Sequence, residues 1–248
     1  MRLDVAVTPA RAKTWPDRVW IVVDVLRASS TLVTLLESGA GRVYPVKTVA
    51  QARRLARQEK GILAGERNGI PPSGFDFGNS PTSLSRADLS GRSVVLSTSN
   101  GTMVLDLLKE SPKVMVGCFL NARACCQAAV EEALRLQVGV GIACAGVRGD
   151  FALDDTVCVG YLAVEIEREL LARGISPVLN DAARAAGQLY RSYPDIMSAF
   201  LQSASGRRVI EIGDEPDNEF CSRIDVSKKV PVLVPGPVLQ LAAWQSAA

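Results

Sequence analysis

Short polar clusters follow several β-branched, apolar runs of this sequence, and they carry most of the side chains that could do chemistry. The clusters lie at residues 24–31, 65–69, 97–102 and 144–155, and Asn121 follows one further run. The acidic side chains in and near them offer hard oxygen ligands of the kind that Mg²⁺ takes, and they are Asp24, Glu66, Asp76, Asp154 and Asp155. Arg27 and Arg67 offer forked donors that suit phosphate, carboxylate or sulfonate groups. The sequence therefore indicates a site for a multiply anionic small molecule and a divalent metal.

The run at residues 97–102 places hydroxyl groups, an amide and a glycine just before a predicted helix. Ser99, Asn100 and Gly101 would lie at the start of that helix, where backbone amides can hold an anion. Taken alone, the same run is also compatible with a simple capped turn.

The other clusters have plain structural explanations as well. Asp24 could cap the helix that follows it, and Glu66 could form a surface ion pair with its neighbour. Asp154 and Asp155 fit the first turn of a helix, where the helix dipole favours acidic residues. Cys144 ends an apolar run and fits an inert buried thiol. The functional interpretation rests on all these clusters meeting in space.

The chain has no histidine, and this excludes several classes of enzyme. Ser-His-Asp and Cys-His hydrolases, phosphohistidine chemistry and HExxH metal sites all need one. The GxxxxGK[ST], GxGxxG and GxSxG motifs are missing too. Neither the Cys-x5-Arg loop nor the DxDx[TV] pattern occurs, so the two large phosphatase classes that use them are excluded.

Composition predicts a cytoplasmic protein with a substantial core. The 248 residues are 48% hydrophobic, and the net charge of +2 gives no reason to expect a nucleic-acid partner or a membrane surface. No apolar run reaches the roughly 18 residues of a membrane span, and the N-terminal residues do not resemble a secretory signal. Six cysteines without a CxxC pair indicate reduced, mostly buried thiols. A homo-oligomer is left open.

Alternating elements predict an α/β fold, layered α/β/α, with a mostly parallel or mixed sheet. Strands are expected at 19–25, 43–46, 62–64, 94–96, 113–116, 138–144 and 230–234. Helices are expected at 29–37, 48–59, 102–109, 122–136, 153–172, 181–192 and 196–204, with a long loop at 65–81 and a turn at 235–237. We treat residues 1–248 as one unit and leave open a C-terminal subdomain from about residue 175, or two intertwined α/β subdomains. In such sheets ligands bind outside the carboxyl ends of the strands, where the polar clusters would meet.

Several strings of the sequence together resemble the 2-phosphosulfolactate phosphatase family. They are DVLRASST at 24–31, GER at 65–67, GFDFGNSP at 74–81, STSNGT at 97–102, FLNA at 119–122, CAG at 144–146 and FALDDT at 151–156. The resemblance covers residues 20 to 160, and the pair GFDFGNSP and STSNGT is its most specific part. The run Ser97-Thr-Ser-Asn-Gly departs from the commoner Thr-Thr-Asn-Gly type, and no role is carried onto Arg148.

The resemblance implies a Mg²⁺-dependent acid phosphatase with a layered α/β fold. It would hydrolyse (2R)-2-phospho-3-sulfolactate to 3-sulfolactate and phosphate, a step of coenzyme M biosynthesis. That substrate carries about four negative charges at neutral pH, which suits two arginines, a metal and helix-start amides.

We therefore expect three groups of site residues. The expected metal ligands are Asp24, Glu66 and Asp76, and the expected substrate-binding residues are Arg27, Arg67, Ser99, Asn100, Gly101 and Asn121. Asp154 or Asp155 would act as general base or as a further ligand, and Cys144 as nucleophile is the minor alternative. Direct attack by water and a covalent intermediate both stay open. The competing hypotheses are a non-catalytic small-anion-binding protein on the same fold and a homo-oligomeric scaffold.

Overall fold

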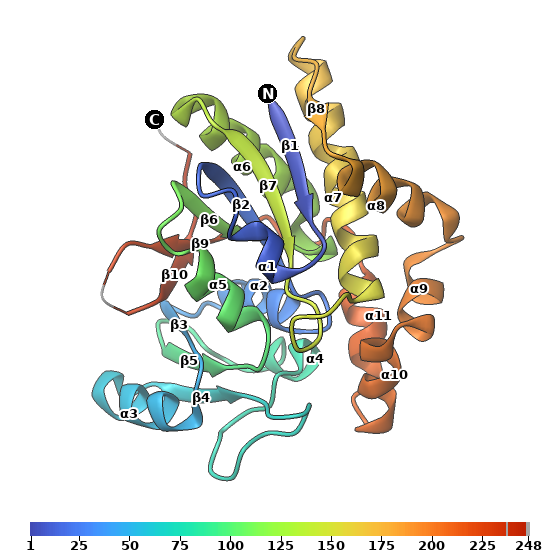
Figure 1. Cartoon of the computed structure of the whole chain (residues 1–248). Helices are drawn as coiled ribbons and strands as arrows, with labels where there is room; N and C mark the ends of the chain where they lie inside the picture. Colours follow the sequence, from blue (N-terminus) through green and yellow to red (C-terminus); the bar gives the residue numbers. More distant parts are fainter. Residues whose placement is uncertain (237, 247–248) are drawn as a thin grey trace.

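One sheet of ten strands runs through the computed structural model, which describes residues 1–236 and 238–246. The strands are β1 (Arg2–Ala6), β2 (Arg18–Val23), β3 (Arg42–Val46), β4 (Ile62–Gly65), β5 (Ser93–Ser97), β6 (Lys113–Val116), β7 (Gly139–Cys144), β8 (Val178–Leu179), β9 (Pro231–Val234) and β10 (Gln240–Ala243). Their order is β4-β5-β3-β10-β9-β6-β2-β7-β1-β8 (Figure 1).

The sheet consists of two parallel parts joined by an antiparallel pair of strands. β4, β5 and β3 pair in parallel, as do β6, β2, β7, β1 and β8. Between them lie β9 and β10, which pair antiparallel with each other and with β6 and β3 respectively. This mixed, mostly parallel sheet confirms the predicted fold class.

Helices cover both faces of the sheet. They are α1 (Pro9–Ala12), α2 (Ala28–Glu37), α3 (Val49–Glu59), α4 (Pro81–Leu84), α5 (Gly101–Leu108), α6 (Ala122–Leu136), α7 (Leu153–Ala172), α8 (Asp181–Ser192), α9 (Ile196–Gln202), α10 (Ala204–Glu211) and α11 (Pro216–Ser222). A single 3₁₀ turn, η1 (Phe119–Asn121), precedes α6. Helices α7 to α11 lie side by side along one flank of the molecule (Figure 1).

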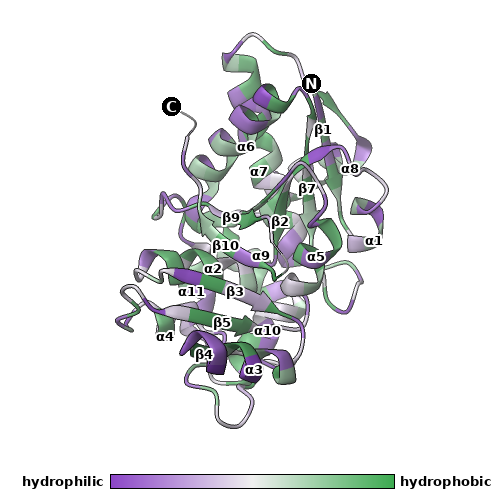
Figure 2. Ribbon diagram, turned by 90° about the vertical axis from the view of Figure 1, so that its left-hand side faces the viewer, coloured by the Kyte–Doolittle hydropathy of each residue, from purple (hydrophilic) through white to green (hydrophobic). Residues whose placement is uncertain are grey.

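Strand β2 shows why this arrangement is stable. Successive side chains of a strand point to opposite faces. Val19 and Ile21 accordingly pack into the core that α6 and α7 cover, whereas Trp20 and Val22 pack into the core on the other face, with residues of α2 and α5. All of these side chains are at most 2% exposed, and the hydropathy colouring places green strands in the middle of the molecule (Figure 2). A strand buried on both faces reads as a continuous apolar run, which is how it was predicted.

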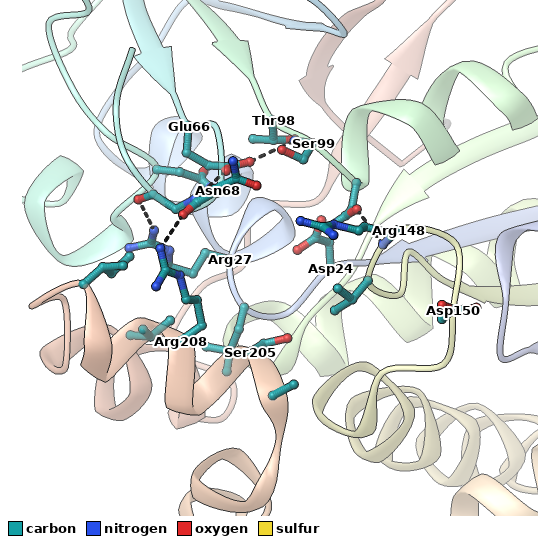
Figure 3. A pocket seen from close by; sticks show the side chains of 18 residues that line it. Asp24, Arg27, Glu66, Asn68, Thr98, Ser99, Arg148, Asp150, Ser205 and Arg208 are labelled. Carbon is teal, nitrogen blue, oxygen red and sulfur yellow. Dashed lines mark hydrogen bonds between the residues drawn. The ribbon is translucent and has the colours of Figure 1, made fainter. Parts of the chain in front are cut away.

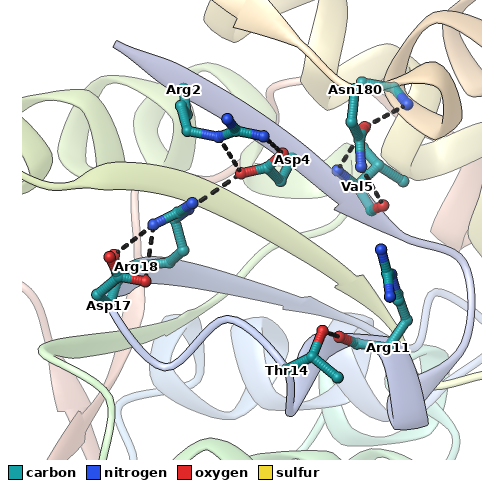
Figure 4. A network of polar contacts seen from close by, with 9 residues as sticks. Arg2, Asp4, Val5, Arg11, Thr14, Asp17, Arg18 and Asn180 are labelled. Carbon is teal, nitrogen blue, oxygen red and sulfur yellow. Dashed lines mark hydrogen bonds and ion pairs between the residues drawn. The ribbon is translucent and has the colours of Figure 1, made fainter.

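Strand β1 was not predicted, because a charge interrupts its short apolar pattern. Asp4 is nevertheless fully buried, and its carboxylate accepts a hydrogen bond from Arg18 Nε at 3.0 Å (Figure 4). Asn180 continues the sheet edge, since its side chain accepts from the Val5 amide at 3.1 Å and donates to the Val5 carbonyl at 3.0 Å. A buried charge such as that of Asp4 needs a charged or hydrogen-bonding partner, and Arg18 supplies it.

One expected helix differs from the structure, and other elements were not predicted at all. The single helix expected at 196–204 is instead two helices, α9 and α10, because Ser203 ends one and caps the other by accepting the Gly206 amide at 2.9 Å. The short elements α1, α4 and β8, the helix α11 and the strand β10 were not predicted. The turn expected at 235–237 includes residue 237, which lies outside the described residues. Within those residues, no helix combines the length and apolar character needed to cross a bilayer.

Candidate active site

A cavity of about 560 Å³ opens at the carboxyl ends of four strands. The loops that follow β2, β4, β5 and β7 all contribute side chains to its wall, and α10 closes it from the C-terminal part of the chain (Figure 3). The predicted meeting of these polar loops is therefore present in the fold. Such a crevice outside the strand ends is the usual ligand site of open α/β sheets.

Five of the sequence-predicted site residues line the cavity. They are Asp24, Arg27, Glu66, Ser99 and Asn100. Gly101 lies directly behind them, since a Cβ atom there would be 2.9 Å from Asp24 Oδ2. A larger residue at position 101 would push against this carboxylate.

Asp24 is the acidic centre of the cavity. Its Oδ1 accepts the Ala28 amide at 3.1 Å at the start of α2, and the side chain is almost buried. Burial raises the pKa of Asp24 to about 6; the Ala28 hydrogen bond opposes this rise and the charge of Glu66 adds to it.

Asp154 and Asp155 lie behind Asp24, at the first turn of α7. Burial raises the pKa of Asp154 to about 7, and the charge of Asp24 contributes. Burial also raises the pKa of Asp155 well above its ordinary value, with the charges of Asp154 and Asp24 adding to the rise. Neither residue lines the cavity. Both Asp155 oxygens accept backbone amides, from Val25 at 2.8 Å and Gly146 at 2.9 Å, so this residue ties two loops of the site together.

Glu66 organises the opposite wall of the cavity. Its Oε1 accepts the Ser99 amide and its Oε2 accepts the Gly69 amide, each at 2.8 Å (Figure 3). One carboxylate thus joins the loop after β4 to the loop after β5. Each oxygen keeps a second lone pair for a further partner.

Arg27 lines the cavity with its charge already matched by carboxylates. Its Nη1 donates to Asp217 Oδ2 at 2.7 Å and also to Asp214, and its Nη2 donates to the Gly69 carbonyl at 3.2 Å. Burial by itself would lower the pKa of Arg27, but the hydrogen bonds that it donates to the two carboxylates raise that pKa above its ordinary value. The guanidinium is therefore fixed and always charged.

Arg67 has a different place from the one expected. Its Nη1 donates to the carbonyls of Glu66 and Ser97, and its Nη2 donates to the carbonyl of Lys47 at 2.6 Å and to Ser97 Oγ at 2.8 Å. The side chain does not line the cavity. It holds the backbone beneath Glu66, because its donors are used by the protein itself.

Asp76, Asn121 and Cys144 also lie outside the cavity lining. Asp76 is exposed, and its Oδ2 accepts the Leu63 amide at 2.8 Å. Asn121 is fully buried, accepts from the Cys118 amide, and donates to the carbonyls of Val116 and Lys229. Cys144 is fully buried, and burial raises the pKa of its thiol well above the ordinary value. A thiol in such surroundings does not supply a thiolate.

Other cavity residues were missed by the sequence interpretation. Asn79, three residues beyond Asp76 in the GFDFGNSP string, is 4% exposed and lines the wall, as does Thr98 at 2%. Asn79 Oδ1 and Thr98 Oγ1 are both buried and have no hydrogen-bond partner among the described residues. The presence of Asn79 in a polar loop was the signal that could have found it.

Two further arginines line the cavity, Arg148 after β7 and Arg208 on α10. The Arg148 backbone amide donates to Asn100 Oδ1 at 3.1 Å, whereas Arg208 Nη2 donates to the Asn68 carbonyl at 3.1 Å (Figure 3). Arg208 could not be recognised from the sequence, because it belongs to an ordinary amphipathic helix.

The donor set of the cavity fits a hard divalent cation. Asp24 and Glu66 supply carboxylate oxygens, and the buried, unpartnered oxygens of Asn79 and Thr98 are of the same hard type. In the part of the chain that the structure describes, no three Asp, Glu or Cys side chains gather as a preformed metal cage. Mg²⁺ commonly takes one or two carboxylates and completes its shell with water and substrate phosphate, so the cavity suits it.

Comparisons with known proteins show which family the chain is similar to. A family model described as 2-phosphosulpholactate phosphatase matches residues 6–236. Proteins named "Probable 2-phosphosulfolactate phosphatase" are similar over most of their length. The one from Thermotoga petrophila is 38% identical over 220 residues, which is 88% of this chain and 90% of that protein. Those from Thermus thermophilus and Clostridium acetobutylicum are 37% and 33% identical, covering 94% and 88% of this chain and 94% and 91% of their own lengths.

Proposed function

The chain belongs to the 2-phosphosulfolactate phosphatase family, whose members are named as phosphoric monoester hydrolases, and on this basis we propose its reaction. It hydrolyses 2-phospho-3-sulfolactate, or a similar small anionic phosphoester, to 3-sulfolactate and phosphate with the help of Mg²⁺. We further propose that it does so in the cytoplasm, within coenzyme M biosynthesis. The buried free thiols of its six cysteines agree with a reducing compartment.

One observation carries this proposal: Asp24, a buried acid of raised pKa that interacts with the buried Asp154, lines a cavity that arginines also line. A protein that only bound anions would gain nothing from these acids, because they repel the ligand. Acids and arginines together suit a site that must hold a cation, a phosphoester and a proton.

The residues of the chain divide this work between them. Arg27, Arg148 and Arg208 bind the phosphate, sulfonate and carboxylate groups. Asp24 and Glu66 would hold Mg²⁺, and the bound ion would supply Lewis-acid polarisation of the phosphoryl group and a lower pKa for water.

Asp154 is the proton-carrying group of the proposed reaction. Its pKa of about 7 lies near neutral pH, where a general base works best, and its Oδ1 has no partner among the described residues. The Ser205 hydroxyl interacts with the Asp154 carboxylate and also lines the cavity. It can therefore pass a proton between Asp154 and a group in the cavity. Hydrolysis consumes one water, whose oxygen and one hydrogen end on phosphate. Asp154 carries the other hydrogen to the 3-sulfolactate hydroxyl. Cys144 has no part in this scheme because its thiol is buried away from the cavity.

The test is phosphate release from 2-phospho-3-sulfolactate by the purified protein, measured with Mg²⁺, with EDTA, and after Mg²⁺ is restored. We expect activity only when Mg²⁺ is present. Asp24→Asn should abolish activity, whereas Asp88→Asn, at an acid outside the cavity, should leave it intact. Activity that persists in EDTA would refute the metal assignment. Binding of the phosphoester without any release of phosphate would instead establish the anion-binding alternative.

A further inference from the structure

Arg27 is held from behind by the C-terminal helices. Its side chain is 4% exposed, and its Nη1 lies between Asp217, 2.7 Å away, and Asp214. Together with the bond to the Gly69 carbonyl, these contacts occupy three of its five N–H donors. The remaining donors have no partner in the described part of the chain, so they can meet an anion in the cavity that Arg27 lines.

The two carboxylates beside Arg27 differ in their surroundings. The Asp217 side chain is 1% exposed, whereas that of Asp214 is 37% exposed. Water screens the exposed pair, so its contribution is small, while a buried pair is screened much less. Asp217 is therefore the main partner of the arginine.

Asp217 is itself fixed by a third segment of the chain. Its Oδ1 accepts the Ser80 hydroxyl at 2.8 Å and the Thr82 amide at 3.1 Å, at the start of α4. Ser80 directly follows Asn79, which lines the cavity. One buried carboxylate thus ties the first turn of α11, the loop before α4 and the cavity arginine into a single arrangement.

We propose that Asp217 is a positioning residue for the reaction: it holds the Arg27 guanidinium at the cavity wall before substrate arrives. A fixed arginine loses little freedom when the anion binds, and a donor aligned in advance stabilises charge without reorganisation. This inference rests on the proposed function, because it takes Arg27 to be a substrate contact. It also assigns the C-terminal part of the chain a direct share in the site.

A double-mutant cycle tests the proposal. Asp217→Asn and Asp214→Asn are each made in the natural chain and in an Arg27→Met background. We measure kcat and KM for 2-phospho-3-sulfolactate with Mg²⁺, and the Kd of inorganic phosphate by calorimetry. Asp217→Asn should raise KM and the phosphate Kd about 10- to 100-fold, the range by which loss of a partner behind a metal-ligating side chain weakens binding or activity. Asp214→Asn is the matched control and should change them less than about threefold.

In the Arg27→Met background, Asp217→Asn should add less than about a twofold further loss, because residues that act through one another are not additive. A purely structural Asp217 would lower the melting temperature but leave KM and Kd unchanged in the folded fraction. That result, or an equal loss in both backgrounds, would overturn the proposal. If Asp217→Asn does not fold, Asp217→Glu keeps the charge but displaces it, and should raise the same two quantities. The phosphate Kd decides about Asp217 even if the natural chain does not hydrolyse phosphosulfolactate.

Discussion

Replacing Asp24 by Asn should make the folded protein more stable at pH 8 while abolishing activity. Asp24 is 8% exposed, and burial, opposed by the Ala28 amide and reinforced by the charge of Glu66, raises its pKa from 3.8 to about 6. Ionised Asp24 therefore destabilises the folded state relative to the unfolded chain. Removing the ionisable group removes this cost, and it also removes a ligand that the proposed reaction needs.

The sign of the pH dependence follows from proton binding. Between pH 3.8 and about 6 the native state keeps the Asp24 proton that the unfolded chain has released, so stability falls as pH rises through this window. The cost is absent below the window and complete above it. A rise from 3.8 to about 6 corresponds to about 3 kcal/mol.

Part of this gain is lost again in the variant. Asn keeps an oxygen for the Ala28 amide, but its NH₂ group would replace Oδ2, the atom next to Gly101. This mismatch costs about 1 kcal/mol, the typical net value of one hydrogen bond. A net gain of about 2 kcal/mol raises the melting temperature of a chain of this size by about 4–8 °C.

The assay is thermal unfolding of both proteins at pH 4 and pH 8, in EDTA so that no metal offsets the charge. Asp4→Asn is the matched control, because Asp4 is also a buried acid but is paired with Arg18 at 3.0 Å. Its replacement removes the buried partner of Arg18, which then keeps only the exposed Asp17, and should lower the melting temperature. The reasoning about Asp24 is wrong if Asp24→Asn lowers the melting temperature at pH 8 as Asp4→Asn does. It is also wrong if Asp24→Asn raises the melting temperature equally at pH 4 and pH 8.

Three further predictions concern residues on either side of the cavity wall. Thr98→Val and Thr82→Val each remove a buried hydroxyl that has no partner among the described residues, so neither variant should have a lower melting temperature. Thr98 lines the cavity and Thr82 does not, so only Thr98→Val should lower kcat/KM, by about tenfold. Asp76→Ala should cost about 1 kcal/mol in denaturant unfolding, because the Leu63 amide loses its acceptor, and a changed Mg²⁺ dependence would instead identify Asp76 as a ligand. Cys144→Ala should keep its kcat, and iodoacetamide should not inactivate the native protein; inactivation that the variant escapes would restore the thiol as nucleophile.

The parts of the fold that the sequence predicts well are those whose pattern is local. Strand β2 is apolar throughout because helices cover both of its faces, and its length and flanking residues identify it. Strand β1 is not recognised by the same criterion, since Asp4 interrupts its apolar pattern and is acceptable there because Arg18 of β2 and Arg2 pair with it. The insertion of β9 and β10 between β3 and β6 depends on pairing across the whole chain, which no local pattern records.

The site residues also divide into those that a local pattern predicts and those that only the folded chain reveals. Asp24 and Glu66 were predicted at one cavity because each follows a strand, and parallel strands bring their carboxyl ends to one edge. Sequence cannot distinguish Arg27 from Arg67, because both donate to groups of the protein and only the folded structure shows that Arg27 alone lines the cavity. Asp76 and Asn79 belong to one loop, and only its folded path decides which side chain enters the cavity.

Charge at the cavity explains why a cation belongs in the proposed reaction. The carboxylates of Asp214 and Asp217 already match and exceed the charge of Arg27, so this arginine adds no net positive charge to the wall. Asp24 and Glu66 would face a substrate with about four negative charges, and protonation cannot relieve this, since Asp24 with a pKa of about 6 is ionised at neutral pH. A divalent cation between these acids and the phosphoester would turn two repulsions into attractions. Phosphoester affinity should therefore fall steeply when Mg²⁺ is removed, and Asp24→Asn, which removes one of the repelling charges, should weaken that dependence.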